Sequence, residues 1–422
     1  MKKEVKRLLS TTLFFALLLV ALWGCTLLLE DRTPAKTNRT FFDSKTNYDV
    51  IFMGTSHVWN GILPMELWKE YGISSFNWGY SNSTPAQNYY LLKEIVKYTD
   101  PKVVVLDING VIEYQELGNG KYKNDTIMSS HVQFDEFPLS INKIEAVYDL
   151  FDDYDGRNDF LWDFIMYHNR WDSLSSEDFD YELSTEKGAE YQTGWTSSGI
   201  NLIDPNEKFE NLEDYTCFQY LIKTLEFCQE KNIPVLCVCL PHMMSEDSMR
   251  VANTIGDVIN SYEGCAYLNL LYSDIINFSV DINIDGGHVN YAGARKTTSF
   301  LGNILKTSFP LDDYSQNEYW IEDYEKYHAY KISKLKEQDN LLNYLMLLYK
   351  TDIDYSLEIY NEEVIYDYII GSMIFLNELQ YTLETPPVEG TAAHILIKNP
   401  DGSIADDVYF SYSDGNYIRT NI

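Results

Sequence analysis

Cysteine is scarce in this chain. There are six cysteines among 422 residues, and five of them lie beyond Cys25. An odd and thinly spread set excludes the disulfide framework of a small secreted domain. Two of the five, Cys237 and Cys239, lie inside the apolar run PVLCVCL, and no spacing matches that of a zinc site. The cysteines therefore indicate neither a disulfide-stapled protein nor a zinc-binding one.

Basic residues are also few. The 32 lysines and arginines face 64 aspartates and glutamates, which gives a formal net charge of −32 at pH 7. Such a surface repels phosphate groups, so nucleic acid is not an expected partner. Internal repeats and low-complexity tracts are absent as well. The length predicts two or three globular domains, and the apolar content is ample for their cores.

One long apolar run stands at the N-terminus. It covers Leu8–Leu29 and, at about 1.5 Å per residue, would form a helix roughly 33 Å long that can cross a bilayer. A cleaved signal peptide and a lipoprotein signal acylated at Cys25 are the alternatives. Trp23 is bulky for a lipobox and the run continues past Cys25, so an uncleaved anchor over residues 1–30 is favoured. The basic head places the remaining chain outside the cytoplasm; it comprises Lys2, Lys3, Lys6 and Arg7.

After a linker at residues 31–45, apolar runs typical of buried strands alternate with helix-period segments. This βα pattern predicts an α/β domain over residues 46–307, with five fully buried parallel strands and helices on both faces, a doubly wound sheet. Such sheets place their sites beyond the carboxyl ends of the strands. The five runs are YDVIFMG, ISSFNWG, KVVVLDI, IPVLCVCL and CAYLNL.

The other segments are predicted as follows. Residues 110–211 form an aromatic, acidic insertion, read as a helical cap that packs its own core, or alternatively as a lid that offers aromatic faces to a sugar. Residues 308–338 form a solvated linker helix. Residues 339–422 form a small α/β domain of unknown role, with a helix from about 362 to 379 and a hairpin whose turn is Asp401-Gly402.

Polar residues follow each of the predicted strands, and we expect them to meet at one rim of the sheet. A serine nucleophile there needs a base within hydrogen-bond reach. His288 is the better base for Ser56, since His57 is its neighbour on a turn and should point away, and Asp285 can orient His288. His57 and His242 are left outside the triad as candidates to face the substrate, with a structural role as the alternative for His242. The full rim set is Ser56, His57, Asn77–Gly79, Asn82, Asp107, Asn109, His242, Asp285 and His288.

These residues resemble the SGNH, or GDSL-like, hydrolases over roughly residues 46–307. GTSH supplies Ser56, NWG supplies Gly79, and DGGH supplies Asp285 and His288. The resemblance implies a flavodoxin-like sheet and a Ser-His-Asp triad that needs no metal or organic cofactor. It also implies an oxyanion hole made by the N–H groups of Ser56 and Gly79. The family's Gly-x-Asn-Asp block has no counterpart, so the oxyanion asparagine is either Asn109 or Asn82.

GTSH together with a membrane anchor is similar to one branch of that family. The branch contains the DltD proteins of teichoic acid alanylation and the acetyltransferases that modify alginate. This similarity implies a single-pass cell-membrane protein whose extracytoplasmic domain is a serine esterase or O-acyltransferase. Its substrate would be an acylated cell-surface glycan or another ester. The alternative is a non-catalytic glycan-binding or assembly protein on the same fold.

Overall fold

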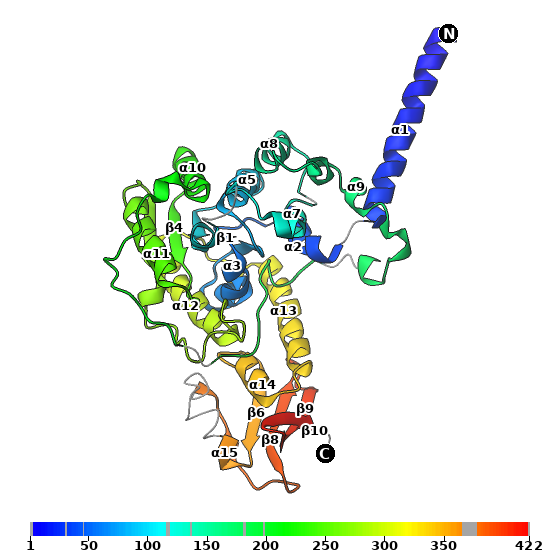
Figure 1. Ribbon diagram of the computed structural model, residues 1–422. Coiled ribbons are helices and arrows are strands. Elements are labelled where there is room, and N and C mark those ends of the chain that lie inside the picture. Colours follow the sequence, from blue (N-terminus) through cyan, green and yellow to red (C-terminus); the bar gives the residue numbers. More distant parts are fainter. Residues whose placement is uncertain are drawn as a thin grey trace.

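The computed structural model is shown in Figure 1. It describes residues 3–29, 32–44, 46–114, 119–135, 137–179, 183–196, 199–364 and 378–420. Most of the helix predicted at about 362–379 lies outside these residues, and the described part is α15 (Glu362–Val364). Single-turn 3₁₀ helices occur at η1 (Asn124–Thr126), η2 (Arg157–Leu161), η3 (Arg170–Asp172), η4 (Glu177–Phe179), η5 (Leu212–Asp214) and η6 (Leu270–Tyr272).

The predicted five-stranded parallel sheet is confirmed. Its order is β2-β1-β3-β4-β5, so the chain starts near the middle and winds outward in both directions. Four of the strands are buried along their whole length. The fifth, β5, lies at an edge of the sheet and its residues are partly exposed, so the prediction that all five strands are fully buried is wrong for β5. The strands are β1 (Val50–Gly54), β2 (Ser75–Gly79), β3 (Val103–Asp107), β4 (Val235–Cys239) and β5 (Cys265–Asn269).

Helices cover both faces of this sheet. Successive side chains of a strand point to opposite faces, and accordingly Ile51 and Met53 belong to one apolar cluster while Val50 and Phe52 belong to another. The first face is covered by α5 (Pro85–Ile95), α10 (Thr216–Lys231) and α11 (Glu246–Ile259). The second is covered by α3 (Ser56–Gly61), α4 (Pro64–Tyr71) and α12 (Tyr291–Ser308).

The insertion after β3 is helical and has a small core. Phe151 and Phe160 stack with ring centroids 4.1 Å apart, and they pack in one cluster with Phe134 and with Tyr220 of α10. Much of the aromatic content therefore packs internally, as the cap interpretation predicts, whereas Trp171 is 71% exposed. The helices are α6 (Asn109–Glu113), α7 (Ile127–Phe134), α8 (Ile141–Leu150) and α9 (Asp163–Tyr167).

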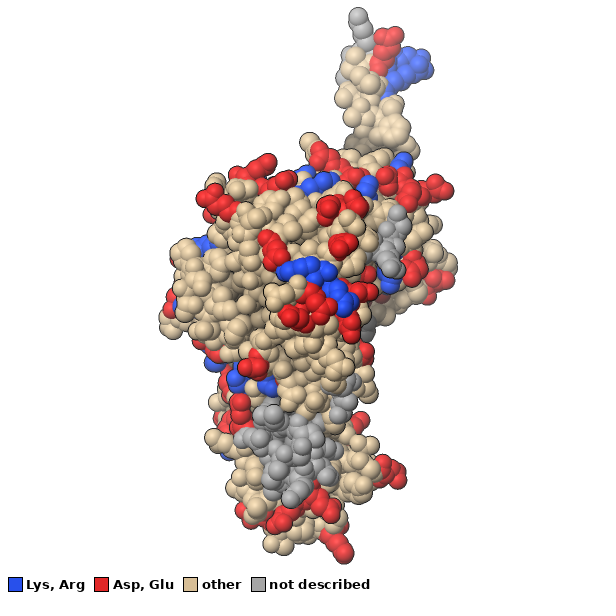
Figure 2. All heavy atoms as spheres, turned by 60° about the vertical axis from the view of Figure 1, so that its left-hand side comes forward, with Lys and Arg blue, Asp and Glu red and all other residues tan. Residues whose placement is uncertain are grey.

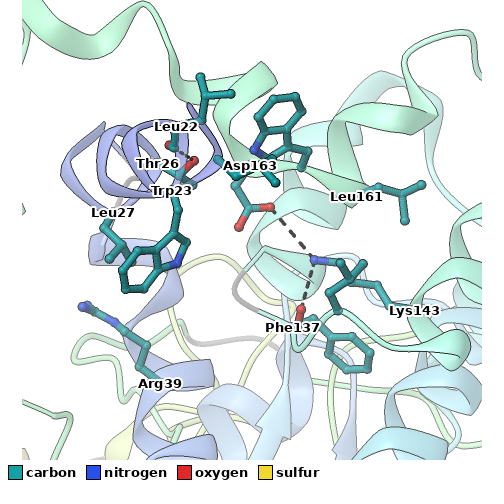
Figure 3. A pocket seen from close by; sticks show the side chains of 12 residues that line it. Leu22, Trp23, Thr26, Leu27, Arg39, Phe137, Lys143, Leu161 and Asp163 are labelled. Carbon is teal, nitrogen blue, oxygen red and sulfur yellow. Dashed lines mark hydrogen bonds and ion pairs between the residues drawn. The ribbon is translucent and has the colours of Figure 1, made fainter. Parts of the chain in front are cut away.

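Helix α1 (Lys3–Leu29) projects away from the body (Figure 1). It is the one helix of the described residues that is long and apolar enough to cross a membrane. Only its last turns touch the insertion, where Arg170 donates to the Leu29 carbonyl at 2.9 Å. A cavity of about 500 Å³ lies between α1 and the insertion (Figure 3). Its apolar walls include Leu22 and Trp23 of α1 and Leu161 of the insertion.

The expected linker at residues 31–45 is wrong, because most of it forms α2 (Arg32–Phe42), which is part of the core. Phe41 is 3% exposed. Its ring centroid lies 5.1 Å from that of Phe76 and 4.9 Å from that of Trp78, both on β2. Asn38 donates to the Asp135 carbonyl of the insertion at 2.8 Å. Helix α2 therefore joins the sheet to the insertion.

The C-terminal region holds a second, mixed sheet of order β10-β9-β8-β6-β7, and the hairpin predicted at Asp401-Gly402 joins β8 to β9. Helix α13 (Glu318–Lys336) is not simply a solvated linker, since Trp320 and Tyr327 are buried on its inner side. The remaining elements are α14 (Leu341–Leu347), β6 (Asp354–Ile359), β7 (Thr382–Leu383), β8 (Thr391–Lys398), β9 (Ile404–Ser413) and β10 (Asn416–Thr420).

The second sheet shares its core with the parallel-sheet domain. Ile282 and Val289, which flank the loop that carries His288, lie in the same apolar cluster as Leu345 of α14 and Phe410 of β9. The boundary placed at residues 338 and 339 therefore separates two sheets but not two independent cores.

Candidate active site

Ser56 stands where β1 changes abruptly into α3. Gly54 ends the strand with φ +158°, and a Cβ there would lie 2.6 Å from Asp107 Cβ, so the position excludes a side chain. Thr55 caps the helix, because its side chain accepts the N–H of His57 at 3.3 Å. Ser56 is consequently the first residue of α3, at the carboxyl end of a central strand.

His288 is presented by a tight loop before α12. Ile282 and Val289 form an antiparallel bridge that closes the loop, and Gly286 takes φ +71° within it. Asp285 Oδ1 accepts N–H bonds from Gly287 at 3.0 Å and from His288 at 3.1 Å. Its other oxygen lies 2.6 Å from His288 Nδ1. The aspartate thus holds both the backbone and the ring of His288.

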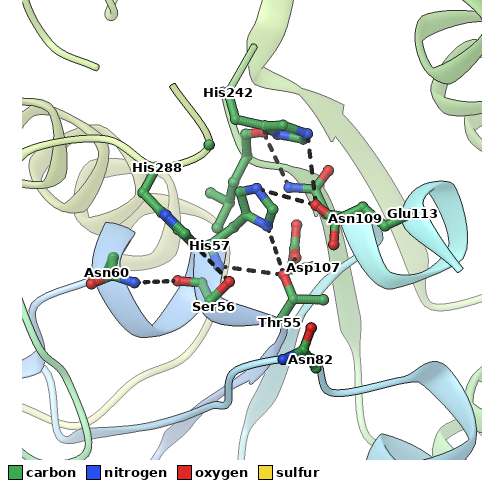
Figure 4. Close-up of polar contacts among 12 residues, drawn as sticks. Thr55, Ser56, His57, Asn60, Asn82, Asp107, Asn109, Glu113, His242 and His288 are labelled. Atoms are coloured by element: carbon green, nitrogen blue, oxygen red, sulfur yellow. Dashed lines mark hydrogen bonds and ion pairs between the residues drawn. The ribbon is translucent and has the colours of Figure 1, made fainter. Parts of the chain in front are cut away.

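The structure brings the three predicted triad residues together. His288 Nε2 lies 2.7 Å from Ser56 Oγ (Figure 4). With Nδ1–H donated to the Asp285 carboxylate, Nε2 is the nitrogen with a lone pair that can accept the hydrogen bond of the Ser56 hydroxyl. Ser56 is half-buried, and 21% of the His288 side chain is exposed. The group has the geometry of an activated serine nucleophile that is open to solvent on one side.

The predicted oxyanion donors differ from one another in their hydrogen bonds and in their burial. The N–H of Ser56 is among the N-terminal helix donors that have no partner within the helix. The Gly79 N–H instead donates to Asn77 Oδ1 at 2.8 Å, and Asn109 is buried and donates to the Leu240 carbonyl at 3.3 Å. Asn82 is half-buried with φ +57°. Of the two candidate asparagines, Asn82 is therefore the one at the surface of the site.

Asn82 is also held by its surroundings. Its Nδ2 donates to Ser81 Oγ at 3.1 Å and to Ser129 Oγ at 3.4 Å. Its Oδ1 accepts from the Tyr114 hydroxyl at 3.5 Å. The two longest of these bonds are weak by ordinary criteria, so the contact with Ser81 is the strongest of the three.

His57 and His242, the candidate substrate-facing residues, are both buried, with 6% and 5% exposure, which favours the structural alternative for His242. Their ring centroids are 4.1 Å apart. His57 Nδ1 lies 2.7 Å from Thr55 Oγ1, which donates to Asp107 Oδ2 at 3.3 Å. Both histidines approach Glu113 Oε1, at 3.4 Å from His57 Nε2 and 4.0 Å from His242 Nε2. The two histidines form a buried polar cluster beside Ser56, and they are not on its solvent-exposed side (Figure 4).

Glu113 was missed from the sequence because it lies within the insertion, at the last residue of α6. The only sequence feature that pointed to Glu113 was its place in a short helix directly after β3, the strand that ends at Asp107. Burial raises the pKa of Glu113 to about 7. Burial, together with the charge of Glu113, raises the pKa of Asp107 to about 8. The two carboxyl groups therefore hold protons at a pH where surface carboxylates hold none.

The two imidazoles beside these carboxyl groups are shifted the other way. Burial lowers the pKa of His242 to about 4. Burial also lowers the pKa of His57 well below its ordinary value, with help from the neighbouring His242 and His288. Both rings are neutral near pH 7, and each offers one nitrogen lone pair.

A cavity of about 400 Å³, within the range of small-ligand sites, is lined by residues of α3 and of the segment that follows β2, but by none of the three triad residues. Trp59, three residues after Ser56 on α3, forms one wall. Aromatic and polar side chains line it together: Thr37, Trp59, Gly79, Tyr80, Ser81, Ser129, Val132 and Glu190. This mixture suits a ligand with both apolar faces and hydroxyl groups.

Acidic side chains are spread over the body, while basic ones gather in a few places (Figure 2).

No protein-family model matches the chain, and no curated protein is significantly similar to it.

Proposed function

We propose that this protein is a serine esterase or O-acyltransferase that works through an acyl-enzyme. The observation that carries the proposal is the chain of two short contacts, 2.7 Å from Ser56 Oγ to His288 Nε2 and 2.6 Å from His288 Nδ1 to Asp285. The residues come from the two ends of one α/β domain, and the serine begins a helix at a strand end. Nucleophile, base and orienting carboxylate are then in the order that acyl transfer requires.

In the proposed reaction, Ser56 Oγ attacks the ester carbonyl carbon as its proton passes to His288 Nε2. The Asp285 carboxylate stabilises the imidazolium that forms. The N–H of Ser56, aided by the Asn82 amide, holds the oxyanion of the tetrahedral intermediate. His288 then returns the proton to the departing alcohol as the ester C–O bond breaks, which leaves an acyl group on Ser56. Water or a sugar hydroxyl releases this group by the same steps in reverse order.

The substrate class we propose is an acylated cell-surface glycan. Two features support it: the cavity that Trp59, three residues after Ser56 on α3, lines together with Tyr80 and several hydroxyl groups, and the apolar helix α1. Aromatic faces and hydroxyl groups suit a sugar ring. With α1 as a single-pass anchor and its basic head in the cytoplasm, the site lies on the outer side of the cell membrane. The acyl acceptor, water or sugar, decides between hydrolysis and transfer.

The test uses the full-length protein in detergent micelles with a fluorescent fluorophosphonate and a chromogenic acetyl ester. We expect stoichiometric labelling and turnover, and loss of both in Ser56→Ala. Ser308→Ala, at the exposed end of α12, is the matched control and should behave like the wild type. Absence of labelling in the wild type, or labelling that persists in Ser56→Ala, rejects the catalytic proposal in favour of a non-catalytic glycan-binding role. Mass spectrometry of added glycan then distinguishes transferase from esterase.

A further inference from the structure

Three potential metal ligands converge beside Ser56. His57 Nε2, His242 Nε2 and a Glu113 carboxylate oxygen all lie within 4.8 Å of one another. Among the described residues, no other three His, Cys, Asp or Glu side chains are so arranged. The three come from α3, from the segment after β4 and from the end of α6. No short sequence motif could reveal such a set, because each ligand belongs to a different segment.

The contacts of the two rings show which nitrogens face Glu113. His242 Nδ1 lies 3.2 Å from the Leu240 carbonyl, which only accepts, so Nδ1 carries the proton of this ring and Nε2 has the lone pair. His57 Nδ1 lies 2.7 Å from Thr55 Oγ1, which is also within hydrogen-bond distance of Asp107 Oδ2. On both rings, Nε2 is the nitrogen on the Glu113 side (Figure 4).

Each of the three groups can donate an electron pair to a metal ion from the side on which they face one another. The Gly287 carbonyl also approaches His57, where it is an acceptor for an N–H of that ring. A cation bound by all three groups satisfies every one of them.

We propose that His57, His242 and Glu113 bind one divalent transition-metal ion of the zinc class. Imidazole nitrogen and carboxylate oxygen are ligands of that class, and bonds of about 2.0–2.2 Å in a tetrahedron separate ligand atoms by about 3.4 Å. The contact of His57 with Glu113 already has this length, 3.4 Å, and that of His242 is 4.0 Å. Glu113 keeps 30% of its side chain exposed, which leaves an open side for entry and for a fourth ligand.

The hydrogen-bond partners of the two histidine rings, on the side away from Glu113, are of the kind that metal-binding histidines usually have. One ring donates to a backbone carbonyl, and the other is connected through Thr55 to the buried carboxyl group of Asp107. Because His57 directly follows Ser56, a bound ion would hold the first turn of α3 and thereby the position of the serine. The proposal does not depend on the esterase activity, since metal binding is measured without substrate.

The experiment uses full-length protein purified without a histidine tag, stripped with a chelator and dialysed against zinc. Elemental analysis should then give about one zinc per chain. The unfolding temperature should rise on zinc addition, and cobalt should give the visible absorption bands of a four-coordinate site. Loss of an outer partner commonly weakens metal binding 10- to 100-fold, so His242→Ala and Glu113→Gln, which remove direct ligands, should weaken it by about 100-fold or more.

The matched control is His394→Ala on β8. That histidine also lies between two carboxylates, Glu358 and Asp407, but outside the cluster, so this variant should retain about one zinc. Wild-type protein that retains less than about a tenth of an equivalent, with no change in unfolding temperature, overturns the proposal even if a variant fails to fold. Equal zinc retention in wild type, His242→Ala and Glu113→Gln overturns it as well, because the ion is then bound elsewhere.

Discussion

Asp285 contacts His288 twice, once at the backbone and once at the ring. One carboxylate oxygen accepts the His288 N–H at 3.1 Å, and the other lies 2.6 Å from Nδ1. The same residue therefore shapes the loop and selects the tautomer of the proposed base. These two roles are separable by mutation, because an asparagine at this position keeps one acceptor for the backbone but loses the negative charge.

Asp285→Asn should lower kcat for the acetyl ester by about 10⁴-fold, the loss typical of a wrong tautomer in a serine triad. KM should change little, since the carboxylate does not contact the substrate. Initial rates across a range of ester concentrations test this. Asp247→Asn, on the exposed surface of α11, is the control and should leave both constants unchanged. A loss of less than tenfold in Asp285→Asn would show that the contact is not catalytic.

A second prediction concerns the proposed oxyanion hole. Asn82→Gly should lower kcat by about 10² to 10³, the usual loss for one oxyanion donor. Glycine is chosen because Asn82 has φ +57°, which glycine adopts without strain. Asn109→Ala should instead lower the unfolding temperature, since that amide is buried and donates to the Leu240 carbonyl. If Asn82→Gly keeps full activity while folded Asn109→Ala loses it, the assignment of the two asparagines is reversed.

The sequence predicted which residues lie at the strand ends better than it predicted the contacts that those residues make. Ser56 could be placed because it directly follows an apolar run, and His288 because it lies between the last such run and the last helix of the domain, so topology brings both to the carboxyl ends of the parallel strands. Gly79 follows the same logic, but its N–H is already bonded to Asn77, a local competition that no pattern reveals. Glu113 was missed because its proximity to His57 depends on how the insertion folds over the sheet.

The linker predicted at residues 31–45 was wrong for a similar physical reason. Helix α2 is rich in polar residues apart from Phe41 and Phe42, so its composition resembles that of a linker. Its place in the core depends on Phe41 packing against Phe76 and Trp78 of β2. Tertiary contacts of this kind are invisible to periodicity, because one buried aromatic does not make a repeating pattern.

A buried ion cluster predicts how stability depends on pH. Glu66 of α4 lies 3.0 Å from Lys331 Nζ of α13 and 3.1 Å from Arg295 Nη1 of α12. Burial alone would raise the pKa of Glu66, but the two cations together lower it below its ordinary value of 4.5. A carboxyl group with a lowered pKa in the folded state adds stability above its unfolded pKa. That stability is lost as the pH falls through the folded pKa.

The free energy of unfolding should therefore fall as the pH drops below about 4.5, and Glu66→Gln should weaken this dependence. At pH 7 the variant should be less stable by about 3–5 kcal/mol, since buried Arg295 loses its 3.1 Å carboxylate contact and Lys331 keeps only Asp352, at 2.8 Å. Urea titrations between pH 3 and pH 7 measure both effects. Glu337→Gln, whose side chain is 56% exposed at the end of α13, should follow the wild-type curve. An unchanged acid limb in Glu66→Gln would contradict the linkage.

The last prediction concerns the shared core of the two sheets. Phe410 on β9 is fully buried in the cluster that also contains Ile282 and Val289, beside the His288 loop. Tyr412, two residues further along the same strand, is 60% exposed. Phe410→Ala should cost about 3–5 kcal/mol, as large-to-small changes in a core do. Tyr412→Ala should cost less than about 0.5 kcal/mol, as surface changes usually do.

Calorimetry with fluorophosphonate labelling during heating shows whether the sheets unfold together. Because the cluster is continuous, the wild type should have one main transition, and Phe410→Ala should move that whole transition to lower temperature. Labelling of Ser56 should disappear at the same temperature, although Phe410 lies on the other sheet. Two transitions, with labelling surviving the one that Phe410→Ala shifts, would mean that the second sheet is an independent module. A glycan-binding role separate from the serine would then be the better reading of residues 339–422.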